Sequence, residues 1–182
     1  MKASHLTLSA FVVLSLAGCA STQVRTDYDE QASFARLKTY DWIESNGEKK
    51  GMPGIHSALV AERIRSAVEN ELAKMGYQKV ISGTPDFRVA HYVVAEEKLA
   101  VRTFDQYYGY GYSVHRHYGH PTYAQEYVRG TLILDIIDAE NNDLIWRGWA
   151  TKALDQNPKP ASVRMYVERA VRKILRRFPP TG

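Results

Sequence analysis

The chain has 182 residues, of which 45% are hydrophobic and 24% charged, and its 24 basic and 20 acidic side chains leave a net charge of +4. This composition excludes a disordered chain and fits one domain with a core of its own. The single cysteine excludes a disulfide framework and a multi-thiolate zinc site, and the mild basic excess argues against a dedicated nucleic-acid-binding protein.

The first 20 residues have the pattern of a secretory leader. Lys2 precedes an apolar run that ends in Leu16-Ala17-Gly18-Cys19. The run is too short for a mature transmembrane helix, but its length suits a signal peptide. The tetrapeptide resembles the lipobox of bacterial lipoproteins, which implies cleavage after residue 18 and acyl chains on Cys19. We therefore expect residues 1–18 to be a signal peptide and residues 19–23 a lipidated tether.

The residue after the cysteine predicts the destination of the anchored protein. Ala20 lacks the acidic character that lipoproteins associate with retention in the inner membrane. The resemblance therefore implies an outer-membrane lipoprotein that faces the periplasm. Several acyl chains on one residue hold a protein at a bilayer far more firmly than one chain does, since each buried methylene contributes about 0.8 kcal/mol. The expected partner is thus a membrane, contacted through Cys19, and not nucleic acid.

The first half of the mature chain predicts two strands and a helix. Weak alternation of apolar and polar residues favours a strand over residues 24–28, and a clearer pattern favours one over residues 37–43. Residues 46–54 have the composition of an exposed loop. Apolar residues at helical spacing predict a helix over residues 57–75, with Gly76 just past its end.

The second half predicts two further strands, a hairpin and a final helix. A short strand is expected at residues 77–81 and, after a turn at 82–85, a long one at 86–101. The clearest hairpin joins residues 127–137 to 144–154 through the turn formers at 138–143. An apolar stripe at helical spacing continues over residues 163–178, and two prolines follow it.

These elements predict an α+β fold. Two amphipathic helices that pack on one face of a mostly antiparallel β-sheet make a two-layer sandwich. The economical interpretation is a single periplasmic domain over residues 24–180.

The same residues resemble a known family. The mature chain is similar, nearly end to end, to the bacterial envelope lipoproteins grouped as domain of unknown function 4136. The resemblance implies an α+β envelope lipoprotein with no assigned activity, so it transfers no catalytic or ligand-binding residue. The matching segments are Asp27-Tyr28-Asp29, Lys38-Thr39-Tyr40-Asp41-Trp42, Leu72-Ala73-Lys74-Met75-Gly76-Tyr77, Pro85-Asp86-Phe87, Gly130 to Asp138, Leu144-Ile145-Trp146-Arg147-Gly148 and Phe178-Pro179-Pro180.

A Tyr-, Gly- and His-rich loop is expected at residues 103–127, and two uses of it stay open. Its histidines have a spacing that could share zinc, copper or nickel if the loop folds back, or they could simply be solvated. Exposed tyrosines among small residues also form adaptable binding surfaces for a protein or a glycan. The metal-ligand candidates are His115, His117 and His120, and the surface candidates are Tyr107, Tyr108, Tyr110, Tyr112 and Tyr118.

Two other groups of charged residues could carry function. The final helix bears basic residues that could attract anionic lipid or another envelope polyanion, although a solvated face explains them equally. Asp135 and Asp138 are three residues apart, so in a regular strand they point to opposite faces and make a poor catalytic pair. Asp86 is more simply a residue of a strand start. The basic candidates are Arg169, Arg172, Lys173 and Arg176.

The sequence therefore predicts a non-enzymatic structural or accessory binding module of the cell envelope, anchored by lipid and without a cofactor. A metal-binding envelope protein that uses His115, His117 and His120 is the alternative. An envelope hydrolase is a more remote one, because neither a nucleophile-elbow motif nor a phosphate-binding glycine loop is present.

Overall fold

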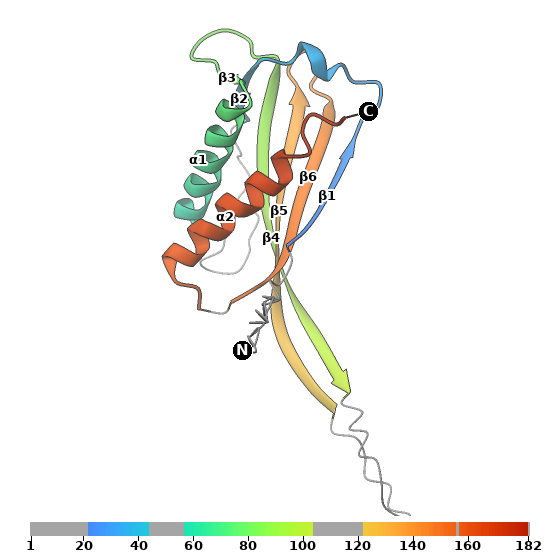
Figure 1. Ribbon diagram of the computed structural model, residues 1–182, viewed down its shortest axis with the longest axis vertical. Helices are drawn as coiled ribbons and strands as arrows, with labels where there is room; N and C mark the ends of the chain where they lie inside the picture. The colour runs from blue at the N-terminus through green and yellow to red at the C-terminus, as the bar shows by residue number, and fades with distance from the viewer. Residues whose placement is uncertain (1–21, 44–56, 104–121, 156, 182) are drawn as a thin grey trace, which may run out of the picture.

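The computed structural model describes residues 22–43, 57–103, 122–155 and 157–181, which form an α+β structure (Figure 1). The elements follow the expected order, with a 3₁₀ turn between the first two strands. They are β1 (Gln23–Tyr28), η1 (Phe34–Arg36), β2 (Thr39–Trp42), α1 (Ala58–Lys74), β3 (Gln78–Lys79), β4 (Phe87–Thr103), β5 (Thr122–Asp138), β6 (Leu144–Leu154) and α2 (Pro160–Leu175).

The six strands form one sheet in the order β1-β6-β5-β4-β2-β3. The pairs β1–β6, β6–β5 and β5–β4 are antiparallel, whereas β2 runs parallel to both β4 and β3. The expectation of a mostly antiparallel sheet is therefore wrong, and the sheet is mixed. The reason is the crossover: α1 carries the chain from the end of β2 back to the end of the sheet where β2 began, so β3 and β4 run in the direction of β2.

The central hairpin is longer than its sequence pattern indicates. Thr103 pairs with Thr122, so β5 begins five residues before the expected start and the strands enclose residues 104–121. Strand β6 ends at Leu154, which pairs with Val128. Beyond that point residues 98–103 and 122–127 continue as a two-stranded ribbon that projects from the domain (Figure 1).

The helices begin and end for local reasons that the sequence carries. The hydroxyl of Ser57 caps α1 by accepting a hydrogen bond from the N–H of Val60 at 3.3 Å. Gly76 follows the helix with φ +91°, a left-handed conformation that glycine adopts without strain. Helix α2 begins at Pro160, earlier than its apolar stripe, because proline suits the first helical position.

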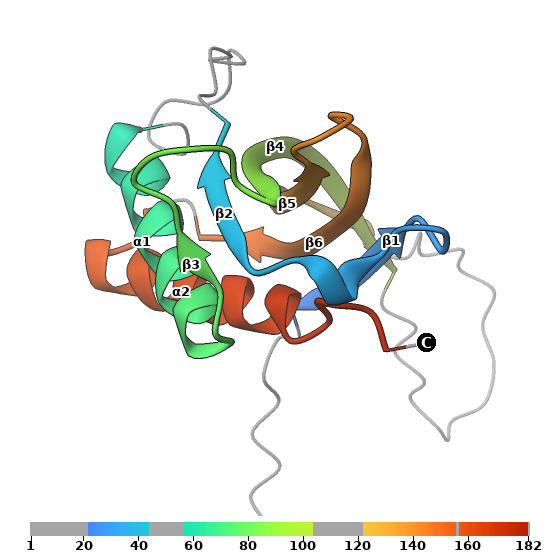
Figure 2. The ribbon, with the colours of Figure 1, turned by 90° about the horizontal axis from the view of Figure 1, so that it is seen from above.

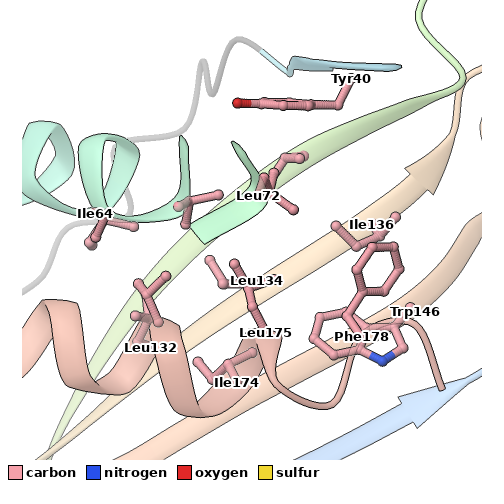
Figure 3. Packing of buried hydrophobic residues seen from close by; sticks show 14 of the residues in the cluster. Tyr40, Ile64, Leu72, Leu132, Leu134, Ile136, Trp146, Ile174, Leu175 and Phe178 are labelled. Atoms are coloured by element: carbon pink, nitrogen blue, oxygen red, sulfur yellow. The ribbon is translucent and has the colours of Figure 1, made fainter. Parts of the chain in front are cut away.

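Both helices lie on the same side of the sheet (Figure 2). The strand residues that face them alternate along each strand and supply about half of the core, including Val89, Leu134 and Ile136, each with no exposed surface. Helix residues of the same kind, among them Leu72 and Ile174, pack onto them (Figure 3). The core thus occupies the space between the helix pair and one face of the sheet.

Gly148 allows α2 to lie close to β6. A Cβ atom at this position would collide with the ring of Trp146 and would lie 2.5 Å from a methyl group of Ile174. Both neighbours are fully buried, so neither can easily move away. The position therefore sets the distance between the last helix and the sheet.

We expect Gly148→Ala to lower the free energy of unfolding by about 1–3 kcal/mol, because it overpacks this contact. Gly130→Ala is the matched control. Its Cβ would meet only the flexible end of the half-buried Leu154 side chain, so a cost below about 1 kcal/mol is expected. Urea denaturation of the three proteins measures both effects, and equal losses would show that the α2–β6 distance is not the constraint.

Candidate functional site

Several residues singled out in the sequence lie outside the described residues. These predictions stay untested: the lipid on Cys19, the surface tyrosines Tyr107, Tyr108, Tyr110, Tyr112 and Tyr118, and the metal ligands His115, His117 and His120. Among the residues that the structure describes, no three His, Cys, Asp or Glu side chains come together as metal ligands would.

The basic residues of α2 are described, but they do not converge. The guanidinium of Arg172 lies 3.4 Å from the carboxylate of Glu71 and so links α2 to α1. Together with an interaction with Lys74, this contact lowers the pKa of Glu71. Arg169 and Arg176 are exposed and Lys173 is half-buried. One of the four candidates therefore has a structural role, and the other three form no common site.

The three aspartates considered for catalysis each have a structural partner. Asp135 is buried and accepts two hydrogen bonds from Arg147, at 2.6 and 2.7 Å. Asp138 is paired with Arg36 of η1. Asp86 accepts hydrogen bonds from the backbone N–H groups of residues 38 and 39, and these bonds lower its pKa. The three carboxylates therefore stabilise different contacts of the fold and do not converge on one site.

The candidate site that the described residues do form is a cavity of about 890 Å³ between the helices and the sheet. Its walls are the first halves of α1 and α2, the central parts of β4 and β5 and the end of β6. This volume lies within the range of roughly 300–1,000 Å³ that is usual for small-molecule sites. Both helices and β1 begin at this end of the domain, at the base of the ribbon (Figure 1).

The cavity is apolar inside and polar where it opens. Its most buried lining residues are Ile64, Leu132 and Val167, which are 1%, 4% and 4% exposed. Exposed residues mark the opening, among them Leu59, 68% exposed, and Asp155. An apolar interior with a few polar groups at its opening is the usual form of a ligand pocket.

The cavity exists because large side chains gather at the other end of the helices. There the rings of Tyr77, Phe87, Trp146 and Phe178 pack on one another with centroid separations of 5.3–5.9 Å. Towards the helix starts no such cluster of rings fills the space between the layers, and the lining there includes small and aliphatic residues such as Gly130 and Val163.

The half-buried polar residues of the lining include Arg63, Lys152 and Tyr166. The ammonium of Lys152 lies 5.2 Å from the ring centroid of Tyr166, a cation–π distance. The hydroxyl oxygen of Tyr166 is buried with no hydrogen-bond partner among the described residues, and burial raises the pKa of this phenol to about 12.

Sequence reasoning missed all three residues, although one signal was present. Trp146, Gly148, Ala150, Lys152 and Leu154 share the strand face that looks toward the helices, and Lys152 is the one charged member of that set. A lysine among the otherwise uncharged residues of one strand face could have marked the site. Arg63 and Tyr166 carry no such signal, since charged and aromatic residues are ordinary on amphipathic helices.

Comparison with known proteins identifies the family to which the chain belongs. Residues 24–180 match the model of a family described as "Domain of unknown function (DUF4136)". The chain belongs to the DUF4136 family. No curated protein matches it.

Solved structures resemble this DUF4136 chain at low sequence identity. A crystal structure of a PDZ domain protein from Parabacteroides distasonis is 14% identical, with a TM-score of 0.55, over 87% of this chain and 36% of that one. The chain thus spans about a third of the length of that protein. A PelC dodecamer from Paraburkholderia phytofirmans is 12% identical, with a TM-score of 0.47, over 85% of this chain and 95% of that one.

Neither helix in the described part of the chain is long and apolar enough to span a membrane.

We expect Tyr166→Phe to raise the free energy of unfolding by about 1 kcal/mol, because it removes a buried hydroxyl that lacks a partner. Tyr92→Phe, on an exposed ring of β4, is the control and should change stability by less than about 0.5 kcal/mol. Thermal and urea denaturation measure both variants. A loss of 1 kcal/mol or more in Tyr166→Phe would mean that the hydroxyl is bonded.

Proposed function

We propose that this protein is a lipid-anchored module of the bacterial cell envelope that binds a small apolar ligand without transforming it. In this proposal Cys19 carries the lipid, and the domain faces the periplasm from the outer membrane. The domain is a two-layer sandwich whose helical layer and sheet form the walls of the binding cavity. The observation that carries the proposal is the apolar cavity of about 890 Å³ at the end of the domain where β1 begins.

The position of the cavity fits an anchored protein. Gln23, the first residue of β1, pairs with Thr151, which directly precedes the lining residue Lys152. Cys19 is four residues before Gln23, and four residues span at most about 14 Å. A lipid on Cys19 would thus hold the cavity end of the domain close to the bilayer, where apolar ligands are concentrated.

A binding role is also favoured over hydrolysis by the carboxylates. Glycosidic or similar hydrolysis needs an acid and a base that converge on one site. In the described part of the chain Asp135 and Asp138 are each neutralised by a different arginine. Glu97 and Asp155 line the cavity opening, but both are exposed, so they do not form the enclosed acid–base pair that hydrolysis needs.

The anchor is tested by Cys19→Ser. We expect this variant to stay unprocessed or to become soluble, and to lose the acyl mass seen on the mature wild-type protein, because serine cannot form the thioether. Ser21→Ala is the matched control and should fractionate with the outer membrane. Unchanged outer-membrane fractionation of Cys19→Ser, with no acyl mass on the wild type, would refute the anchor.

The cavity is tested by filling it. Val163→Trp places an indole inside the cavity, whereas Met165→Trp places the same group on an exposed position of the same helix. In the full chain that also carries Cys19→Ser, we expect the neutral dye N-phenyl-1-naphthylamine to bind to the parent and to Met165→Trp. In Val163→Trp its fluorescence titration should show at least about tenfold weaker binding, because the occupied volume excludes the dye. Equal affinities in all three would reject the cavity as a binding site.

A further inference from the structure

Lys152 occupies a position that packing alone does not explain. Its neighbours on the same face of β6, Ala150 and Leu154, are apolar, and the helices cover that face. The side chain is half-buried, and its ammonium lies over the ring of Tyr166. No carboxylate of the described residues lies within ion-pairing distance of it. A cation thus lies in the wall of an apolar cavity with no counter-ion among the described residues.

Arg63 adds a second cation, from the α1 wall of the cavity. It is half-buried on α1, beside the lining residues Val60 and Ile64, and again no described carboxylate lies within 4 Å of it. Arg147 and Arg36, by contrast, are each paired with an aspartate. The cavity cations therefore differ from the arginines that stabilise the fold.

The remaining charges around the cavity do not cancel these two. Glu97 and Asp155 line the opening, but both are exposed, so water and salt screen them strongly. Helices α1 and α2 both begin at the cavity, so the positive ends of their dipoles face it. The interior is therefore apolar at its most buried part, and the half-buried charges of its wall, Lys152 and Arg63, are both positive.

We propose that the cavity binds a single-chain amphiphile with an anionic head group, of the fatty-acid class. The inference rests on the proposed binding function and names its ligand. The acyl chain lies on Ile64, Leu132 and Val167, the most buried lining residues. The anionic head group lies between the Lys152 ammonium and the Arg63 guanidinium, and it supplies the counter-ion that these two cations lack among the described residues.

The test uses the mature lipidated protein in nanodiscs and two photoactivatable probes. One is a hexadecanoic acid with a diazirine in its chain, and the other is the alcohol of the same chain and diazirine. We expect both to label peptides of β5, β6 and α2 that line the cavity. The acid should label them about tenfold more efficiently, because only its carboxylate is stabilised by charge-assisted hydrogen bonds.

Charge-removing variants assign the effect to the named residues. Lys152→Met and Arg63→Met keep an apolar stem, so each should reduce labelling by the acid toward that by the alcohol while leaving the alcohol unchanged. Lys152→Arg should retain the preference. Arg129→Met, an exposed position on the other face of β5, is the matched control and should behave as wild type.

The outcomes separate the two proposals. Equal labelling of the cavity by acid and alcohol would overturn the anionic ligand class and leave cavity binding intact. Absence of cavity labelling by both probes would overturn cavity binding as well. Labelling that appears only after Cys19→Ser would identify the protein's own acyl chain as the occupant, and would overturn a free ligand.

Discussion

The aromatic cluster around Phe178 is the contact on which the rest of the structure depends. The Phe178 ring lies 5.3 Å from Trp146, 5.6 Å from Tyr77, 5.9 Å from Phe87 and 6.0 Å from Phe34, measured between centroids. These rings come from η1, β4, β6 and the segments that follow α1 and α2. Aromatic pairs contribute about 0.5–1.5 kcal/mol each beyond the area that they bury. One cluster thus fixes the ends of both helices against the sheet.

The opposite end of the helices is held far less tightly, and that difference makes the cavity. Small and aliphatic residues such as Val60, Val163 and Gly130 lie there beside a few larger polar ones, and together they leave space between the layers. Leaving about 890 Å³ open forgoes the dispersion contacts that close packing would provide. A half-buried lysine and an unbonded tyrosine hydroxyl in the same wall add to that cost. The protein thus tolerates loose and unfavourable packing at one end, which is the usual sign of a site kept for a ligand.

Features that depend on neighbouring residues could be predicted from the sequence, whereas features that depend on distant residues could not. The helix boundaries rest on Ser57, Gly76 and Pro160, whose effects are confined to one turn, and the strands of the hairpin rest on alternation. The parallel pairing of β2 could not be predicted in the same way, since β3 has two residues and no periodicity. The early start of β5 was hidden because the residues before Tyr127 have the composition of a loop, whereas their pairing with β4 is a long-range property.

The candidate site was less predictable than the fold. A sequence motif is a cluster of residues close in the chain, such as His115, His117 and His120. The cavity residues Arg63, Lys152 and Tyr166 are instead separated by up to about a hundred residues. A cavity is a property of distances between elements, and a single sequence without an alignment does not contain them. Of the three, Lys152 alone could be recognised in the sequence, because it is the charged residue on an otherwise uncharged strand face.

The proposed anchor also bears on the basic residues of α2. Arg169, Arg172, Lys173 and Arg176 lie in the second half of the helix, and the cavity and the start of β1 lie at its beginning. Arg169, the first of them, is nine residues after Pro160 and so about 14 Å along the helix, against a Debye length of about 8 Å at physiological salt. A short tether at Cys19 would therefore leave these cations more than one Debye length from the start of the helix. If the anchor is correct, this separation favours an anionic protein or glycan over the anchoring bilayer as a partner of the exposed Arg169 and Arg176.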